Sequence, residues 1–133
     1  MLEKHAINTK AHAEMVDITR AVNETVQKSG VTEGIVYIYS AHTTAGITIN
    51  ENADPDVKTD MIQRFDNVYP WKDPADRHME GNTASHMKTS TVGASQPVII
   101  TGGEMLLGTW QGIYFCEYDG PRNRTVHVKV MSG

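Results

Sequence analysis

Residues 34–52, GIVYIYSAHTTAGITINEN, hold two short apolar runs separated by a histidine and two threonines. The first run, residues 34–40, is rich in β-branched and aromatic residues and too short for a typical helix, so it predicts a buried strand. The second run, residues 45–50, predicts a neighbouring strand. A buried strand needs only apolar residues, so the polar groups at both ends of the second run predict a site that the strand holds in place.

Helical patterns occupy three other segments. Residues 17–29 and 55–67 carry apolar side chains at helical spacing, with Gly30 able to end the first helix. Asp54, followed by a proline, is suited to cap the start of the second helix. Residues 81–93, GNTASHMKTSTVG, predict a third short helix that lies between an asparagine cap and a closing glycine.

The last third of the chain has the character of a β-sheet. Residues 97–108, PVIITGGEMLLG, predict a hairpin because two adjacent glycines supply the positive φ of a tight turn. Residues 109–120 predict a long strand, and residues 124–130 alternate valine with polar residues, as a strand with one buried face does. The fold expected is therefore α+β, with mostly antiparallel sheet and about three helices.

Composition limits the classes of function. A length of 133 residues suits one domain, residues 1–133, and a net charge of −4 gives no overall field that attracts nucleic acid or anionic membrane. The N-terminal segment MLEKHAINTK lacks the apolar stretch of a secretion signal, and no run of about 18 apolar residues occurs. The single cysteine, Cys116, excludes an internal disulfide framework. We expect a cytoplasmic protein without a nucleic-acid or membrane partner.

Side chains of catalytic and ligand types gather in four segments. They are His42, Thr43, Thr44, Asn50 and Glu51; His78, Asn82, His86, Lys88 and Ser90; Glu117; and DGPRNR, residues 119–124, with Arg122 and Arg124. Imidazoles and carboxylates are ligands of divalent metals, and guanidinium groups suit phosphate oxygens. The mixture predicts a metal-assisted phosphate site.

Each of these residues also has a simpler structural explanation. His42 can cap a strand by bonding a backbone carbonyl, and Ser90 can bond back to its own helix. His78 and His86 lie eight residues apart, without the spacing of a helical zinc pair. Asp60 lies off the apolar face of its helix, where solvent exposure is the common outcome.

Aromatic residues follow one side of the predicted strand at residues 109–120. Trp110, Tyr114 and Tyr118 share that side with Cys116. They suit either a core or a platform on which a ring stacks, and the core is the favoured interpretation. Cys116 is then a small buried apolar residue.

Three motifs in this order, HTTAGITINENADPDVKTD (42–60), GNTASHMKTSTVG (81–93) and LGTWQGIYFCEYDGPRNR (107–124), resemble the secondary thiamine-phosphate synthase, or YjbQ-like, family over nearly the full length. The resemblance implies a YjbQ-like α+β fold assembled as a homotrimer, with polar clefts near subunit contacts. It also implies a weak or promiscuous thiamine phosphate synthase activity. That transferase joins an aminopyrimidine methyl pyrophosphate to a thiazole phosphate and releases pyrophosphate.

The candidate residues divide by role under this resemblance. The catalytic candidates are His42, Glu51, His86, Arg122 and Arg124; the substrate-binding candidates are Thr43, Thr44, Asn82, Lys88, Ser90 and Trp110. The candidate ligands of a divalent metal, magnesium or zinc, are His42, His78, His86, Glu51, Asp60 and Glu117. Two alternatives stay open: a zinc-dependent hydrolase built on the three histidines, and a non-catalytic trimeric module that binds a phosphorylated metabolite.

Overall fold

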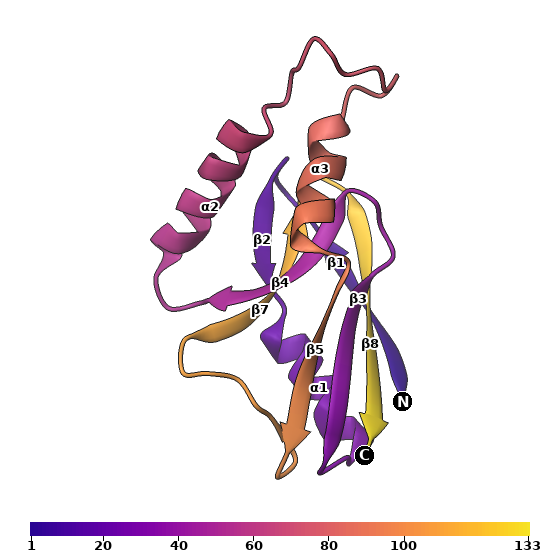
Figure 1. The fold of residues 1–133 in the computed structure, drawn as a ribbon. Helices are drawn as coiled ribbons and strands as arrows, with labels where there is room; N and C mark the ends of the chain where they lie inside the picture. Colours follow the sequence, from indigo (N-terminus) through magenta and orange to yellow (C-terminus); the bar gives the residue numbers. More distant parts are fainter.

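Two antiparallel β-sheets face each other across the core of the computed structural model, which describes residues 1–133 (Figure 1). One sheet has the strand order β1-β8-β3-β5-β6 and the other the order β2-β7-β4. The elements are β1 Leu2–Asn8, β2 Glu14–Asp17, α1 Thr19–Ser29, β3 Gly34–Ser40, β4 Ala45–Glu51, α2 Pro55–Val68, α3 Thr83–Val92, β5 Ser95–Thr101, β6 Glu104–Met105, β7 Gln111–Glu117 and β8 Asn123–Ser132. The predicted α+β class, antiparallel sheet and three helices are confirmed.

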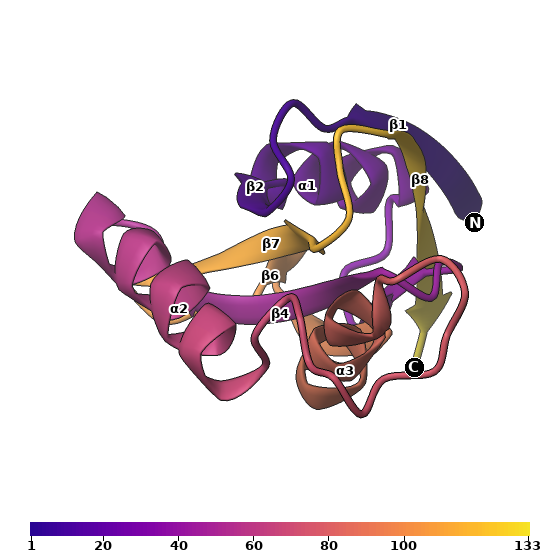
Figure 2. The ribbon, with the colours of Figure 1, turned by 90° about the horizontal axis from the view of Figure 1, so that it is seen from above.

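The core lies between the two sheets and α1. Alternating residues of β8, Val126, Val128 and Val130, are buried there, as their period of two predicts. Helix α1 lies beside the sheets (Figure 2), and its residues Val22 and Val26 belong to the same core cluster. Full burial of such a side chain contributes about 1.5–3 kcal/mol each, so this cluster is the main stabilising term of the fold.

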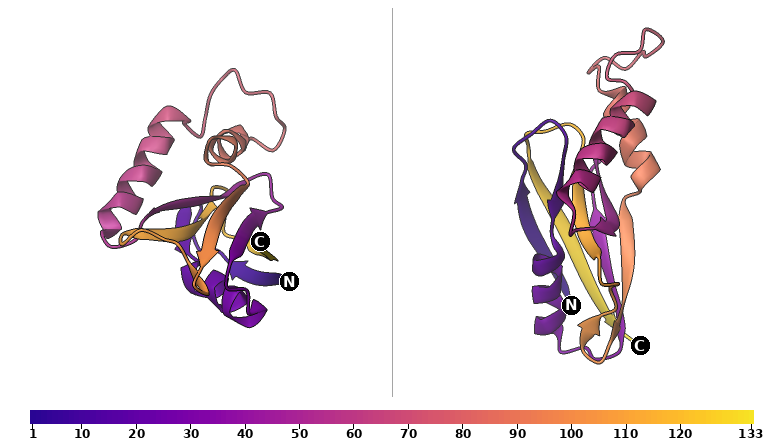
Figure 3. Two further views of the ribbon diagram at one scale, coloured as in Figure 1. Left: turned by 60° about the horizontal axis from the view of Figure 1, so that its bottom comes forward. Right: turned by 90° about the vertical axis from the view of Figure 1, so that its left-hand side faces the viewer.

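Helices α2 and α3 pack on the opposite face of the three-stranded sheet (Figure 3). Tyr114, Cys116 and Tyr118 are buried on that face, with Phe65 of α2 packed against them. Burial raises the pKa of the Cys116 thiol to about 12, so this cysteine is a neutral packing residue at physiological pH, as predicted.

The predicted end of α1 and start of α2 are confirmed by local geometry, whereas Asn82 precedes α3 without a capping hydrogen bond from its side chain. Gly30 closes α1 with φ at 67°, a conformation that glycine adopts without strain. The Asp54 side chain accepts a hydrogen bond from the amide of Asp56 at 2.9 Å, with Pro55 as the first residue of α2. In the hairpin β5–β6, the turn residues Gly102 and Gly103 both have positive φ.

Two predictions about neighbours are wrong. Strand β4 does not pair with β3; it pairs with β7 in the other sheet, because residues 41–44 carry the chain across the core from one sheet to the other. Trp110 is not part of the core. It precedes β7 and is 63% exposed, whereas Tyr114 and Tyr118 are buried as expected.

The outer face of the five-stranded sheet carries an exposed apolar patch, with the exposed Lys129 beside it opposite Tyr37. Its exposed residues include Ile35, Tyr37, Ile99 and Met131. Ile35 lies opposite Ile99 on β5 and opposite Met131 on β8, so three of these side chains are adjacent. None of the helices is long and apolar enough to cross a membrane.

Candidate functional site

A polar pocket of about 400 Å³ forms where three segments meet: the β3–β4 loop, the start of α3 with the loop before it, and the turn after β7. Its lining residues are Ala41, His42, Thr43, Thr44, His78, Glu80, Asn82, His86, Asp119, Arg122 and Arg124. The structure therefore brings the predicted histidines and arginines together, although they come from segments far apart in the sequence.

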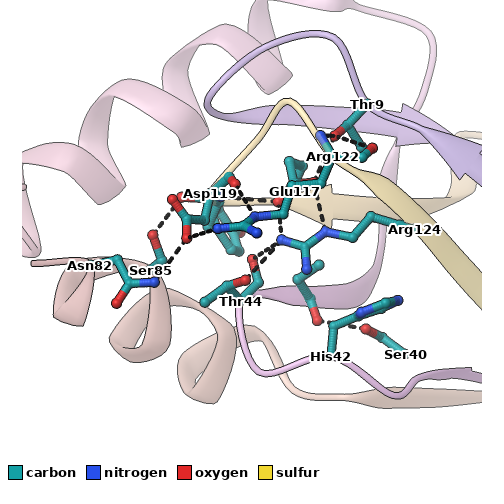
Figure 4. A network of polar contacts seen from close by, with 12 residues as sticks. Thr9, Ser40, His42, Thr44, Asn82, Ser85, Glu117, Asp119, Arg122 and Arg124 are labelled. Atoms are coloured by element: carbon teal, nitrogen blue, oxygen red, sulfur yellow. Dashed lines mark hydrogen bonds and ion pairs between the residues drawn. The ribbon is translucent and has the colours of Figure 1, made fainter. Parts of the chain in front are cut away.

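A buried ion pair forms the back wall of the pocket. Glu117, at the end of β7, is fully buried, and Arg124 of β8 is 7% exposed. Arg124 donates from Nε to Oε1 of Glu117 at 2.8 Å and from Nη2 to Oε2 at 2.5 Å, which is a bidentate arrangement (Figure 4). Two further donors complete the carboxylate: the Thr9 hydroxyl at 2.7 Å and the Asp119 amide at 3.0 Å.

These bonds decide the charge of Glu117. Burial by itself raises the pKa of the carboxyl, but the hydrogen bonds from Arg124, the Asp119 amide and Thr9, together with the Arg124 charge, outweigh burial and lower it. The group is thus a carboxylate at neutral pH. Both of its oxygens are occupied, so Glu117 is a structural counter-ion and not the metal ligand that its residue type predicted.

Arg124 retains one free edge toward the pocket. Its Nη2 donates to the Thr44 hydroxyl at 2.8 Å as well as to Glu117, whereas Nη1 has no partner within the chain and is not fully buried. Since Arg124 lines the pocket, Nη1 is a donor available to a ligand. The charge of the Arg124 guanidinium is already balanced by Glu117. Nη1 therefore offers an anionic ligand a directed hydrogen bond more than a net electrostatic attraction.

A second arginine is held by the turn that follows β7. Arg122 donates from Nε to the Asp119 carbonyl at 2.8 Å and from Nη2 to Oδ2 of Asp119 at 3.0 Å. Asn82, at the start of α3, donates to the same Oδ2 at 2.8 Å. The Arg122 side chain is half exposed, so this turn presents a cation at the mouth of the pocket while Asp119 joins it to α3.

The His42 side chain continues the hydrogen bonding of β8 at the point where its pairing with β3 ends. The pairing of β3 with β8 ends at Ser40 and Val126, and one step further along β8 the Nε2 of His42 lies 3.1 Å from both the amide nitrogen and the carbonyl oxygen of Thr125. The predicted strand-capping role is confirmed. Nε2 bonds one of these two groups, according to its tautomer, and Nδ1 is left free of backbone contacts.

The environment of His42 favours the neutral ring. Burial lowers the pKa of the imidazole and the nearby Arg124 charge lowers it further, while the Thr125 backbone and Glu117 act in the opposite direction with smaller effect. The net pKa lies below its ordinary value. His42 is therefore an uncharged imidazole at pH 7, able to accept or donate a proton at the pocket wall.

His78 and His86 form a pair on the opposite wall. Their ring centroids lie 5.3 Å apart with the planes nearly perpendicular, and Nε2 of His78 is 3.9 Å from Oε1 of Glu80. His86 is fixed by α3 and His78 by the loop before it. This arrangement places two titratable rings and a carboxylate beside the arginines.

The predicted metal ligands do not come together as one set: His42, His78 and His86 line the pocket, whereas Glu51, Asp60 and Glu117 are not available there. No group of three or more histidine, cysteine, aspartate or glutamate side chains is arranged to hold a metal ion. Antiparallel pairing sets Ala45 opposite Glu117 and Glu51 opposite Gln111, so Glu51 lies at the far end of β4 from the pocket. At about 3.4 Å per residue, Glu51 and Glu117 are roughly 20 Å apart. Asp60 is exposed on α2. Neither the proposed zinc set nor the proposed magnesium set fits this geometry.

Three predicted substrate-binding residues also lie outside the pocket. Lys88 is 2% exposed; its ammonium group forms an ion pair with Asp66 and lies 5.9 Å from the Tyr118 ring centroid, so it braces α3 against α2. Ser90 is exposed on α3, and Trp110 is exposed at the opposite end of β7.

Sequence reasoning assigned no role in this site to three of its residues. Asp119 and Glu80 line the pocket, and Thr9 bonds Glu117 across 108 positions of the chain. Asp119 precedes glycine and proline, so its residue type is fully explained by a turn. A lone threonine at the end of a strand carries no signal of a buried partner.

Replacing Glu117 with glutamine should destabilise the fold. Glu117→Gln removes the charge that balances Arg124 and leaves a guanidinium buried without a counter-ion, so we expect a loss of about 3–5 kcal/mol in the free energy of unfolding. Urea denaturation measures this loss. The control, Glu24→Gln, removes a carboxylate from an exposed pair on α1 and should change stability by less than about 0.5 kcal/mol. A Glu117→Gln protein as stable as Glu24→Gln would contradict the structural role.

Acid unfolding should depend on Thr9. Because the folded pKa of Glu117 is lowered, its stabilising contribution is complete above the unfolded value of about 4.3 and is lost as the pH falls through the folded value. Thr9→Val removes one hydrogen bond to the carboxylate, so acid unfolding should begin at a higher pH, as followed by circular dichroism. Thr59→Val, on the exposed surface of α2, should leave the transition unchanged; identical curves for the two variants would refute the prediction.

Comparison with known proteins agrees with the fold. A protein-family model described as "UPF0047 protein YjbQ-like" matches residues 3–133. The UPF0047 protein YugU of Bacillus subtilis is 64% identical over 131 residues, covering 98% of this chain and 99% of that protein. A UPF0047 protein of Methanocaldococcus jannaschii is 51% identical, covering 98% and 94%.

Solved structures give the same result. The crystal structure of an uncharacterized protein of the YjbQ/UPF0047 family from Clostridium acetobutylicum superposes with a TM-score of 0.95 at 47% identity, covering 97% of this chain and 99% of that one. A hypothetical protein from Aeropyrum pernix also gives a TM-score of 0.95, at 29% identity, covering 100% and 99%. The chain belongs to the YjbQ/UPF0047 family.

Proposed function

We propose that this protein is an enzyme for small phosphorylated heterocycles, with a weak thiamine phosphate synthase-like activity. The observation that carries the proposal is the convergence of three histidines and two arginines in one pocket of about 400 Å³, with a single hydrophobic residue in its lining. That volume is within the range of small-molecule sites. Such a polar lining suits a ligand rich in phosphate and ring nitrogen atoms.

The proposed reaction makes three demands on the site. The bond between the pyrimidine methylene carbon and a pyrophosphate oxygen breaks, and the thiazole nitrogen gives its lone pair to that carbon. Donors must therefore meet the departing oxygens, walls must keep water from the cationic methylene, and the nitrogen must be held in line. In this proposal Arg122, Nη1 of Arg124 and the Thr43 hydroxyl meet the phosphate oxygens, and His86 gives a proton to the leaving group.

The charge balance of the pocket supports a weak rather than a dedicated activity. Arg124 is paired with Glu117 and Arg122 with Asp119, and Glu80 adds a further carboxylate. Hydrogen-bond donors are thus present without a net excess of positive charge. A leaving pyrophosphate is stabilised most strongly where fixed positive charge exceeds negative charge, so we expect slow turnover here.

The alternative of a zinc-dependent hydrolase lacks a supporting ligand set. His42, His78 and His86 line one pocket, but they are not arranged as a group of three metal ligands. No step of the proposal passes through a protein-bound metal. The alternative of a non-catalytic binding module shares the same pocket and differs only in turnover.

Product formation tests the proposal. Purified protein, given both substrates with magnesium to accompany the pyrophosphate, should form thiamine phosphate, and His86→Ala and Arg122→Ala should each lower the rate by about 10²-fold or more. Arg20→Ala, at a side chain 95% exposed on α1, should leave the rate unchanged. Equal product in the wild-type protein and in the His86→Ala variant would refute an enzymatic role; saturable binding without product would establish the binding module.

We also propose that the uncovered face of the five-stranded sheet is the subunit contact of a homotrimer. Ile35, Tyr37, Ile99 and Met131 expose apolar side chains on neighbouring strands. Large contiguous apolar patches on a soluble chain are typical of association surfaces. Figure 2 shows the edge of this sheet on the side away from α2.

Light scattering tests the assembly. The wild-type protein should have three times the mass of the single chain, and Ile35→Lys with Ile99→Lys should reduce it to the monomer because the lysine charges cannot be buried without a partner. Val68→Lys, at an exposed position at the end of α2, should remain trimeric. A monomeric wild-type protein would overturn the proposed contact.

A further inference from the structure

A second cleft lies beside the polar pocket, between the β1–β2 loop and the loop that joins α2 to α3. His12, Asp66, Pro70 and Trp71 line about 500 Å³. Trp71 is 39% exposed, and its ring centroid lies 4.5 Å from that of His12 with the planes perpendicular. A perpendicular contact covers at most one face of the indole, so the other face is not covered by His12.

A third hollow lies between this cleft and the candidate site. Trp71 also lines the next hollow along the loop, and that hollow shares His78 and Glu80 with the polar pocket. The two sites are linked through the backbone as well, because the His12 carbonyl accepts a hydrogen bond from the Gly120 amide at 3.0 Å. Gly120 follows Asp119 of the polar pocket. The aromatic cleft, the hollow beside it and the polar pocket thus adjoin one another in that order.

The polar pocket and the hollow beside Trp71 differ in their balance of charges. In the polar pocket, Arg122 and Arg124 are matched by the carboxylates Asp119 and Glu80. The hollow beside Trp71 is lined by the carboxylates Asp73, Asp76 and Glu80 and by one cation, Lys72. Asp66 of the aromatic cleft is neutralised by the buried Lys88. An indole face beside an excess of carboxylates favours a cation over a neutral or anionic group.

We propose that the Trp71 cleft is a subsite for a positively charged heteroaromatic ring. The ligand is then a molecule with a cationic ring at one end and a phosphate at the other, the ring on Trp71 and the phosphate against Arg122 and Arg124. This assignment rests on the proposed function and extends it: thiamine phosphate, with its thiazolium ring and phosphate, has this distribution of charge. The proposed reaction also calls for a second subsite, since a reaction between two rings needs two places to hold them.

Tryptophan fluorescence tests the subsite directly. The chain has two tryptophans, so Trp110→Phe leaves Trp71 as the single reporter, and Trp110 lies exposed at the far end of β7. The probes are 1-methylnicotinamide, a ring cation, and nicotinamide, its neutral counterpart without the N-methyl group. We expect the cation to quench Trp71 saturably, with a Kd about 2- to 30-fold lower than that of the neutral ring. Asp73→Asn combined with Asp76→Asn should reduce that preference.

A second variant separates the ring subsite from the phosphate end. Trp71→Leu keeps apolar bulk but removes the π face, so calorimetry should show weaker binding of the cation and unchanged binding of inorganic pyrophosphate, with an unchanged melting temperature. Arg122→Ala should show weaker binding of inorganic pyrophosphate and unchanged binding of the cation. Equal affinity for the two nicotinamide probes, or wild-type affinity in Trp71→Leu, overturns the subsite even if thiamine phosphate is formed. Ring-cation binding at Trp71 in a protein without turnover supports the subsite and overturns only the proposed function.

Discussion

The ion pair between Glu117 and Arg124 is the constraint on which the site depends. It joins the end of β7 to the start of β8 inside the protein, where an unmatched charge would be costly. Thr9, Thr44 and the Asp119 amide bond directly to its two members. Through these contacts the β1–β2 region, the β3–β4 loop and the turn after β7 are held in one geometry. The pocket walls are therefore set by a charge pair of which Glu117 is fully engaged, so that only Nη1 of Arg124 is left for a ligand.

Sequence patterns predicted the individual elements well and their partners poorly. The valine alternation of β8 and the helical spacing in α1 identify a buried face, because side-chain direction repeats with a fixed period. Periodicity does not say which strand lies beside which. The short connection between β3 and β4 favoured a hairpin, but the four residues 41–44 cross between sheets, and the Ser40 hydroxyl bonds the Ala45 carbonyl at 2.7 Å within that crossing.

The site was predictable in kind and not in detail. Histidines and arginines in unexpected places indicated a polar pocket, and His42, His78, His86, Arg122 and Arg124 do line one. The carboxylates were assigned wrongly. Glu51 is the last residue of β4 and Glu117 the last residue of β7. Because these strands run antiparallel, the two residues lie at opposite ends of the strand pair. Residue type also does not reveal that both carboxylate oxygens of Glu117 accept hydrogen bonds from Arg124, because this ion pair depends on strand register and burial.

The contact between His42 and the Thr125 backbone has a consequence for tolerance to substitution. The ring bonds main-chain atoms only, so the identity of the side chain at position 125 does not enter the interaction. A wide range of residues there preserves the place of the imidazole, whereas proline, which lacks an amide hydrogen, does not. Other substitutions in β8 thus leave the His42 imidazole in place, provided that the strand keeps its register. A protein built in this way can exchange outward-facing residues of β8 during evolution without rebuilding its polar pocket.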